Sequence, residues 1–218
     1  MESKTRIPKQ KSATKKYDKI VKAGWELITE KGYVNTNTKE IAKKAGVSVG
    51  IIYQYFEDKH DILIVGLNKY GENIFFPLLK IKDDFKILDF SSFIKKFITE
   101  YIKTHKENKI AYEEIKSMVF TDKEVKKFFY SREIKLNEFL YKLLYNSGFN
   151  EENLKEKIHV IVGLIDNLCQ EIVYHKHREM NYEQMAIIVI NSIDKIIKEW
   201  LISFFYLLKK ELFFINIY

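Results

Sequence analysis

The chain has 218 residues, of which 46% are hydrophobic and 31% charged, with eight glycines, two prolines and one cysteine. This length suits one large domain or two small ones, and the apolar content is ordinary for a folded protein. So few glycines and prolines argue against an all-β fold, which needs many turns, while long stretches rich in Lys, Glu, Ile and Leu favour helices. The single cysteine, Cys169, excludes an internal disulfide framework and is expected to be a buried, inert thiol rather than a reactive one.

The positive charge is concentrated at the N-terminal end. Residues 1–60 hold 13 Lys and Arg against 7 Asp and Glu, a net charge of +6, whereas the remaining residues hold 24 against 23, a net charge of +1. A biased use of lysine throughout the chain would not place the excess at one end. A basic terminal segment attracts phosphate, so this asymmetry favours salt-sensitive binding of nucleic acid.

The first predicted helix follows a basic, polar leader over residues 1–13, which we expect to be disordered in isolation. The helix is predicted over residues 14–31, where Ile20, Val21, Leu27 and Ile28 recur at helical spacing and Gly32 supplies a stop. Thr36 or Asn37 can cap a second helix, and Asn37 with Glu40 has the spacing of a capping box.

The stretch over residues 41–59 has the layout of a helix-turn-helix. Ile41, Ala42 and Ala45 form an apolar stripe that ends before Gly46, which accepts the positive φ of a tight turn, and Ser48 is a good N-cap for the next helix. That helix buries Ile52 and Phe56 at i, i+4. Its outer side carries small and polar residues, a pattern that suits insertion into a DNA major groove: Val49, Gly50, Tyr53 and Gln54.

Several further helices are predicted beyond this motif, for an all-α chain of about nine helices. Asp58, Ser91 and Asp122 are the expected N-caps of the first, second and fourth of them. A charged connector is expected over residues 80–89, and a stop at Gly148. The predicted helices cover residues 59–79, 92–105, 110–119, 123–146, 151–177 and 182–208.

The last two predicted helices are apolar on nearly all sides, over residues 158–173 and 185–201. Such a helix must be buried on more than one side. A second copy of the chain would cover the outer side by a four-helix bundle across a two-fold axis, whereas the alternative is one large core without a dimer. We expect the dimer, with Val162, Ile165, Ile193 and Ile197 in its interface.

No set of residues suggests catalysis, and no cofactor or metal site is expected. His175 and His177 are two residues apart and would point in different directions on a helix, unlike a metal-binding i, i+4 pair. The N-terminal end shows no secretory signal, and the apolar run over residues 200–208 is far shorter than the roughly 20 residues of a membrane span. We therefore expect a cytoplasmic protein.

The spaced residues of the N-terminal region resemble the tetracycline-repressor (TetR) family of transcriptional regulators. The resemblance covers about residues 15–63, and beyond that region it lies in the helical architecture only. It is carried by Gly32-Tyr33, Thr36, Glu40-Ile41-Ala42, Ala45-Gly46-Val47-Ser48, Gly50, Ile52-Tyr53, Tyr55-Phe56, Lys59 and Leu63.

The resemblance implies a homodimer that binds palindromic double-stranded DNA and releases it when a small molecule enters the C-terminal domain. By position it assigns Val49, Gly50 and Tyr53 to base edges, and Thr36, Thr38, Tyr55 and Lys59 to phosphates. Physical chemistry agrees for Lys59, because a cation at a helix N-terminus favours an anion, and for the tyrosine hydroxyls, which can donate to phosphate. Ser48 and Gln54 complete the predicted DNA-binding set, with the alternative that the tyrosines only pack the small domain.

The chain after Phe75 is rich in aromatic residues, most of which should be core, while a few should line an effector pocket. Asp166 interrupts the apolar run of its helix and faces either that pocket or the surface. An acidic group among aromatic rings would suit a cationic or hydroxylated ligand. The predicted pocket residues are Phe97, Tyr101, Tyr112, Met118, Phe128, Asp166 and Cys169.

Together these patterns predict a leader over residues 1–13, a helix-turn-helix domain over 14–60 and a helical ligand-binding and dimerisation domain over 61–218. The function predicted is that of a ligand-responsive repressor, homodimeric on DNA. The alternative is a helical adaptor or membrane-surface protein that uses the basic end on acidic lipid. Gly50 and the turn at Gly46 favour the groove, because membrane-surface helices carry bulky apolar faces.

Overall fold

A computed structural model describes residues 8, 10–76, 90–146, 149 and 152–197, without the side chains of residues 90, 91 and 93. The described residues are helical, with no strand among them, which confirms the all-α prediction. Most of the leader, the connector over 80–89, the stop at Gly148 and the run over 200–208 lie outside these residues. Within the described part of the chain, no helix is both long and apolar enough to cross a membrane.

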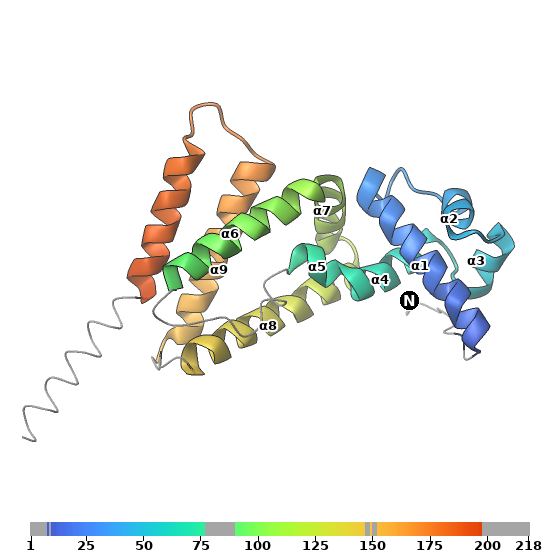
Figure 1. Ribbon diagram of the computed structural model, residues 1–218, viewed down its shortest axis with the longest axis horizontal. Helices are drawn as coiled ribbons and strands as arrows, with labels where there is room; N and C mark the ends of the chain where they lie inside the picture. The colour runs from blue at the N-terminus through green and yellow to red at the C-terminus, as the bar shows by residue number, and fades with distance from the viewer. Residues whose placement is uncertain (1–7, 9, 77–89, 147–148, 150–151, 198–218) are drawn as a thin grey trace, which may run out of the picture. The chain divides into compact units, whose positions relative to one another are not determined.

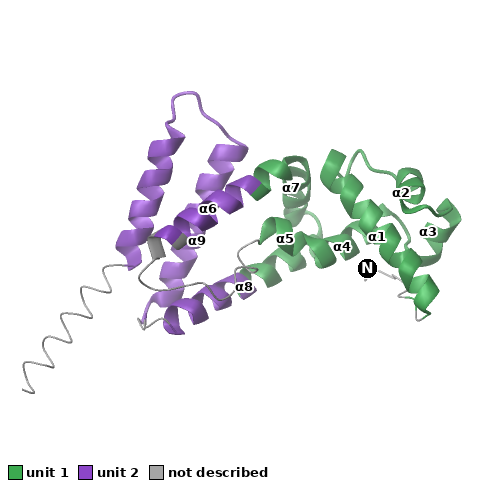
Figure 2. Ribbon diagram, in the orientation of Figure 1, with its two compact units in different colours: residues 1–80, 104–134 green, residues 81–103, 135–218 purple. Residues whose placement is uncertain are grey.

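The chain divides into two compact units, coloured separately in Figure 2. Unit 1 comprises Met1–Lys80 and Thr104–Ile134, and unit 2 comprises Ile81–Lys103 and Lys135–Tyr218. This division groups the N-terminal segment with residues 104–134. The predicted boundary between a DNA-binding and a ligand-binding domain, at residues 60 and 61, stays a prediction.

Unit 1 begins with four helices whose order follows the sequence (Figure 1): α1 (Lys11–Lys31), α2 (Thr38–Ala45), α3 (Val49–Tyr55) and α4 (Lys59–Gly66). Two of their predicted caps are present as hydrogen bonds. Asn37 and Glu40 form the capping box of α2, and the Asp58 carboxylate accepts from the backbone N–H groups of His60 and Asp61 at the start of α4. Ser48 occupies the N-cap position of α3 in extended conformation, but its side chain makes no capping bond.

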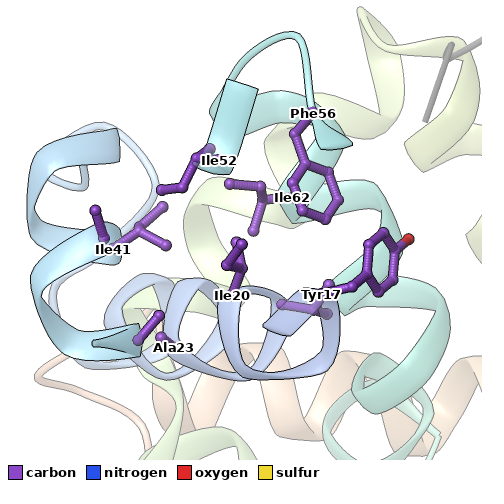
Figure 3. Close-up of a cluster of buried hydrophobic side chains, with 10 residues drawn as sticks. Tyr17, Ile20, Ala23, Ile41, Ile52, Phe56 and Ile62 are labelled. Carbon is purple, nitrogen blue, oxygen red and sulfur yellow. The ribbon is translucent and has the colours of Figure 1, made fainter. Parts of the chain in front are cut away.

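A cluster of buried apolar side chains holds these four helices together. Figure 3 shows Tyr17 and Ile20 of α1, Ile41 of α2, Ile52 of α3 and Ile62 of α4 converging on one another. The rings of Tyr17 and Phe56 stack, with centroids 4.9 Å apart. Burying several such side chains stabilises the arrangement by about 1.5–3 kcal/mol each, so the core rather than the short helices themselves fixes the position of α3.

The helix predicted over residues 59–79 is interrupted and ends early. After α4 a π-helical turn, η1 (Leu67–Gly71), leads into α5 (Glu72–Phe75), and Phe76 leaves the helical conformation at φ −137° and ψ 54°. Pro77 explains the end, because a residue before proline is disfavoured from helix.

The remaining elements of unit 1 are α7 (Lys109–Ser117), the 3₁₀ turn η4 (Met118–Phe120) and the first part of α8 (Lys123–Asn146). Asp122 caps α8 as predicted, accepting from the backbone N–H groups of Glu124 and Val125. An aromatic cluster packs α5 against α7 and α8, in which the Phe75 ring lies 5.4 Å from that of Tyr112 and 4.9 Å from that of Phe129.

Unit 2 contains most of α6 (Phe90–Glu107), the second part of α8, α9 (Leu154–Val173) and a helix over 182–197. Two predicted boundaries are wrong here. Ser91 lies inside α6 rather than at its cap, because the helix already begins at Phe90. The helix predicted over 151–177 runs only from Leu154 to Val173, since residues 175–179 are all polar or charged and offer that helix no apolar side chain to bury.

Candidate nucleic-acid interface

The α3 helix is placed by a tight turn and a buried inner face. Gly46 adopts the left-handed conformation at φ 68° and ψ 38°, and its backbone N–H returns to the last turn of α2. This conformation costs glycine nothing, whereas it strains residues that carry a Cβ atom. Ile52 is fully buried on the inner side of α3. The turn and this anchor leave the opposite side of α3 toward solvent.

The outward side of α3 carries the residues that the sequence predicted for base contacts. Ser48, Gly50 and Gln54 are exposed, Tyr53 is 57% exposed and Val49 is half-buried against the core cluster. Gly50 adds no side chain, so a base edge could approach the helix backbone there. This surface combines a small apolar group with an amide and a phenol, the chemistry that reads base edges in a major groove.

Two of the residues predicted to contact phosphates, Thr38 and Tyr55, lie beside this surface. The Thr38 hydroxyl of α2 and the Tyr53 hydroxyl of α3 are 3.4 Å apart, so the two helices of the motif meet at their outer edges. Tyr55 is half-buried, and its ring lies edge-on to that of Tyr17 with centroids 5.9 Å apart. Packing thus accounts for the Tyr55 ring, whereas the Tyr53 ring is largely exposed to solvent.

Thr36 and Lys59 are engaged inside the domain. Thr36 is 1% exposed, and its hydroxyl donates to the Gly32 carbonyl at 2.7 Å. The Lys59 ammonium donates to the carbonyls of Tyr33 at 2.8 Å, Thr36 at 2.9 Å and, more weakly, Val34 at 3.3 Å. It also lies 4.3 Å from the centre of the Tyr33 ring. In this geometry neither side chain presents its polar group to a phosphate, which differs from the prediction.

The cations nearest the motif divide into paired and solvent-facing groups. Lys44 lies 3.3 Å from Glu26 and 3.6 Å from Glu30, so its charge is neutralised by α1. Lys39 and Lys43 are exposed on α2. The last two are therefore the better placed lysines of α2 for attracting phosphate.

One group of side chains has ligand atoms close enough for a metal among the described residues, formed by Asp58, His60 and Asp61. Its atoms already have structural partners. The Asp58 carboxylate caps α4, the Asp61 carboxylate accepts from the Glu57 N–H at 2.7 Å, and His60 Nε2 lies 2.6 Å from an Asp122 oxygen. This cluster joins the start of α4 to the cap of α8, a contact that the sequence did not predict.

The predicted effector-pocket residues separate into two groups. Phe97, Tyr101, Asp166 and Cys169 belong to unit 2, where the Tyr101 hydroxyl donates to Asp166 at 3.0 Å and Cys169 is fully buried. The remaining three belong to unit 1, where two are buried in the aromatic cluster and one is half-buried in η4: Tyr112, Phe128 and Met118. An open recess of about 360 Å³ lies elsewhere in unit 2, where Glu171 of α9 and Met185 of the last helix are among its lining residues.

The predicted dimer residues are mostly part of the core of a single chain. Ile165 is 4% exposed, Ile193 is fully buried and Ile197 is 4% exposed, while Val162 is half-buried. Their own chain thus covers these isoleucines, and the assignment of the four residues to a dimer interface stays a prediction. The sequence showed that these helices are apolar on several sides but not which side faces inward.

The comparisons with known proteins agree with the geometry of α1 to α4. Residues 20–64 match the model of the family described as bacterial regulatory proteins, tetR family. The chain is similar to the fatty acid metabolism regulator protein of Bacillus subtilis, with 51% identity over 49 residues, and to the HTH-type transcriptional regulator HbdR of Aromatoleum, with 50% identity over 48 residues. These matches span 22% of this chain and 25% and 21% of the two relatives.

Solved structures extend the likeness of the fold to the C-terminal helices. A TetR transcription regulator from Haloarcula marismortui is similar with a TM-score of 0.64 at 14% identity, over 84% of this chain and 97% of that one. A TetR-family regulator from Syntrophomonas wolfei is similar with a TM-score of 0.54 at 21% identity, over 83% and 93% of the two chains. Residues 20–64 thus carry a helix-turn-helix segment of the tetR type, and the described C-terminal helices share their fold with solved TetR-family regulators.

Proposed function

We propose that the protein is a transcriptional repressor that binds palindromic double-stranded DNA as a homodimer and is released by a small-molecule effector. The observation that carries the proposal is the exposed side of α3, where Gly50, Tyr53 and Gln54 face solvent above a tightly packed core. A recognition helix needs this combination, because base readout requires exposed side chains whose positions do not drift.

On DNA, the outward side of α3 enters the major groove. Val49 offers a methyl surface to thymine and Gln54 an amide that can pair with adenine, while Gly50 permits close approach. Thr38, Ser48 and the Tyr55 hydroxyl contact phosphates at the rim, while Tyr53 faces the base edges. Lys39 and Lys43 supply the salt-dependent attraction.

The homodimer is supported by apolar side chains that one chain leaves uncovered on the last two helices. Val160 of α9 is 52% exposed, and Ile187 and Ile188 of the helix over 182–197 are 48% and 63% exposed. Gly163 lies one turn from Val160, and a Cβ atom at Gly163 would meet open space, so another helix can approach closely there. A second copy covers these residues and sets two α3 helices about 34 Å apart, one helical turn of DNA.

An effector in the helical part of the chain would release DNA by favouring one arrangement of the helices. It can shift the DNA affinity only by its differential affinity for the two arrangements, typically about 1–3 kcal/mol. The aromatic residues beyond Phe75 support an apolar or aromatic effector, and the Tyr101–Asp166 pair provides a polar group for a hydroxyl or a cation. We propose that the protein acts in the cytoplasm, where its DNA is accessible.

Selection of duplexes from a random library by the full-length protein tests the proposal. The selected sequences should contain an inverted repeat with half-sites one helical turn apart. Gln54→Ala should then weaken binding at one base pair of each half-site by about 1–3 kcal/mol. The assignment of α3 as the recognition helix would be contradicted if the selected duplexes shared no inverted repeat, or if Gln54→Ala bound them with the same base preference as the unaltered protein.

A further inference from the structure

The loop between α1 and α2, residues 32–37, is held by two charged side chains that are distant in sequence. On one side the Lys59 ammonium binds carbonyl groups of the loop, as described above. On the other side a carboxylate oxygen of Glu114, from α7, accepts the backbone N–H of Val34 at 3.1 Å. The loop is thus held through its acceptors by α4 and through a donor by α7.

Gly32 makes room for the Glu114 carboxylate. Its φ of 91° lies in the region that glycine adopts without strain, and a Cβ atom on Gly32 would lie 2.3 Å from Glu114 Oε1. No side chain other than hydrogen can therefore occupy position 32 with Glu114 in place. The packing of α7 against α1 brings the carboxylate to this position.

From this loop, a continuous set of contacts leads to α3. The buried Thr36 hydroxyl donates back to the Gly32 carbonyl, so the loop is closed on itself. The next residue, Asn37, begins α2 through its capping box with Glu40. Thr38 follows as the first residue of α2, and its hydroxyl lies 3.4 Å from the Tyr53 hydroxyl of α3. The loop is therefore linked directly to the start of α2 and, through Thr38, to the hydroxyl of Tyr53.

We infer that Glu114 is a positioning residue for DNA recognition: it fixes the loop over residues 32–37, and it thereby makes reading of DNA by α3 depend on α7. This inference rests on the proposed function and adds to it a residue outside the helix-turn-helix. A charged acceptor forms a stronger hydrogen bond than a neutral one. Replacing the Glu114 carboxylate by an amide should therefore weaken the bond to Val34, and removing the side chain should abolish it. The removal of Glu114 leaves the exposed cations unchanged but loosens the loop that supports α3, so it should reduce selective binding rather than general attraction to DNA.

The test compares Glu114→Ala and Glu114→Gln with the matched control Glu113→Ala. Glu113 is the preceding residue on α7, and its carboxylate makes only a surface pair with Lys109 at 3.9 Å. Two quantities are measured for the full-length protein: the hydrogen-exchange rate of the Val34 amide, and the affinities for the selected duplex and for random duplex DNA.

In Glu114→Ala, the Val34 amide should exchange at least about tenfold faster and affinity for the selected duplex should fall about tenfold, with affinity for random DNA within about twofold of the unaltered protein. Glu114→Gln, which keeps a neutral acceptor, should be intermediate in both quantities, and Glu113→Ala should match the unaltered protein. If Glu114→Ala fails to fold, Glu114→Gln decides the comparison against Glu113→Ala.

Two results would overturn the inference. Unchanged Val34 exchange would show that Glu114 does not hold the loop. Faster exchange with full affinity for the selected duplex would show that the loop contact does not position α3. A failure of the proposed function is distinguishable, because the unaltered protein itself would then select no duplex, while the exchange measurement would still report whether the contact with Val34 exists.

Discussion

Lys59 provides the sharpest disagreement between sequence and structure, because the two assign its charge to different partners. The sequence predicts a phosphate contact, so Lys59→Met should weaken binding to all DNA and lower the salt slope by roughly one unit. In the structure all three ammonium protons have carbonyl partners, at 2.8, 2.9 and 3.3 Å, and the Tyr33 ring covers the charge. The structure therefore predicts a loss of stability instead.

The size of that loss follows from these contacts. Hydrogen bonds to a charged group contribute about 1.5–3 kcal/mol, and a partly exposed cation–π contact adds about 0.5–1 kcal/mol. These contributions are not additive, and the side chain is half-buried rather than dry, so we expect Lys59→Met to lower the free energy of unfolding by about 2 kcal/mol. Methionine keeps most of the aliphatic stem, so this change isolates the ammonium.

Two assays test the prediction, with Lys39→Met as the matched control on the exposed side of α2. Urea unfolding should show the loss for Lys59→Met and less than about 0.5 kcal/mol for Lys39→Met. In titrations of DNA at several salt concentrations, the slope should fall by about 0.9 per subunit for Lys39→Met and stay nearly unchanged for Lys59→Met. The reasoning is refuted if Lys59→Met unfolds like the unaltered protein while its salt slope falls by a full unit.

Three further predictions concern stability, base preference and assembly. Burial, and then the charge of Lys116, lowers the pKa of His105 to about 3, so the unfolded chain binds this proton first as the pH falls below 6.5. As the pH falls from 7.5 to 5, His105 should therefore lower the free energy of unfolding by about 2 kcal/mol, and His105→Phe should lack this loss. Urea unfolding of both proteins at the two pH values measures the difference, and an equal pH dependence in both would contradict the prediction. Val49→Ala should leave the salt slope alone and relax preference at one base pair at a cost of about 1 kcal/mol, as measured by competition with singly substituted duplexes; a lowered slope would place Val49 on phosphate instead. Ile188→Asp should give a folded monomer by sedimentation at low micromolar concentration, whereas Ile193→Asp should unfold the chain; a dimer in Ile188→Asp would put the interface elsewhere.

Local signals account for what the sequence predicted correctly. Asn37, Asp58 and Asp122 cap helices as expected, because a cap depends on residues two or three positions away. Gly46 has the predicted conformation for the same reason. The exposed side of α3 was also predictable, because the apolar pair Ile52 and Phe56 marks the side that faces the core and leaves the opposite side to solvent.

Contacts between distant segments account for what the sequence could not predict. Glu114 and Val34 are 80 residues apart, and nothing near either position marks them as partners. The side of α9 that faces inward was equally undetermined, because Ile165 and Val160 are similar side chains in an apolar surrounding, and only packing decides that the first is buried. Lys59 shows the same limit, since a lysine at a helix N-terminus suits a phosphate and a set of loop carbonyls alike.

The measurement that tests the central claim most directly is the affinity of the full-length protein for its selected duplex relative to random duplex DNA, at about 0.15 M salt, where non-specific attraction is already weakened. Reading of bases by α3 predicts a ratio of at least about 10³. It also predicts that Tyr53→Ala and Gln54→Ala reduce this ratio, while affinity for random DNA changes little. Equal affinity for the two duplexes would contradict the account, because the basic N-terminal segment would then bind DNA by charge alone.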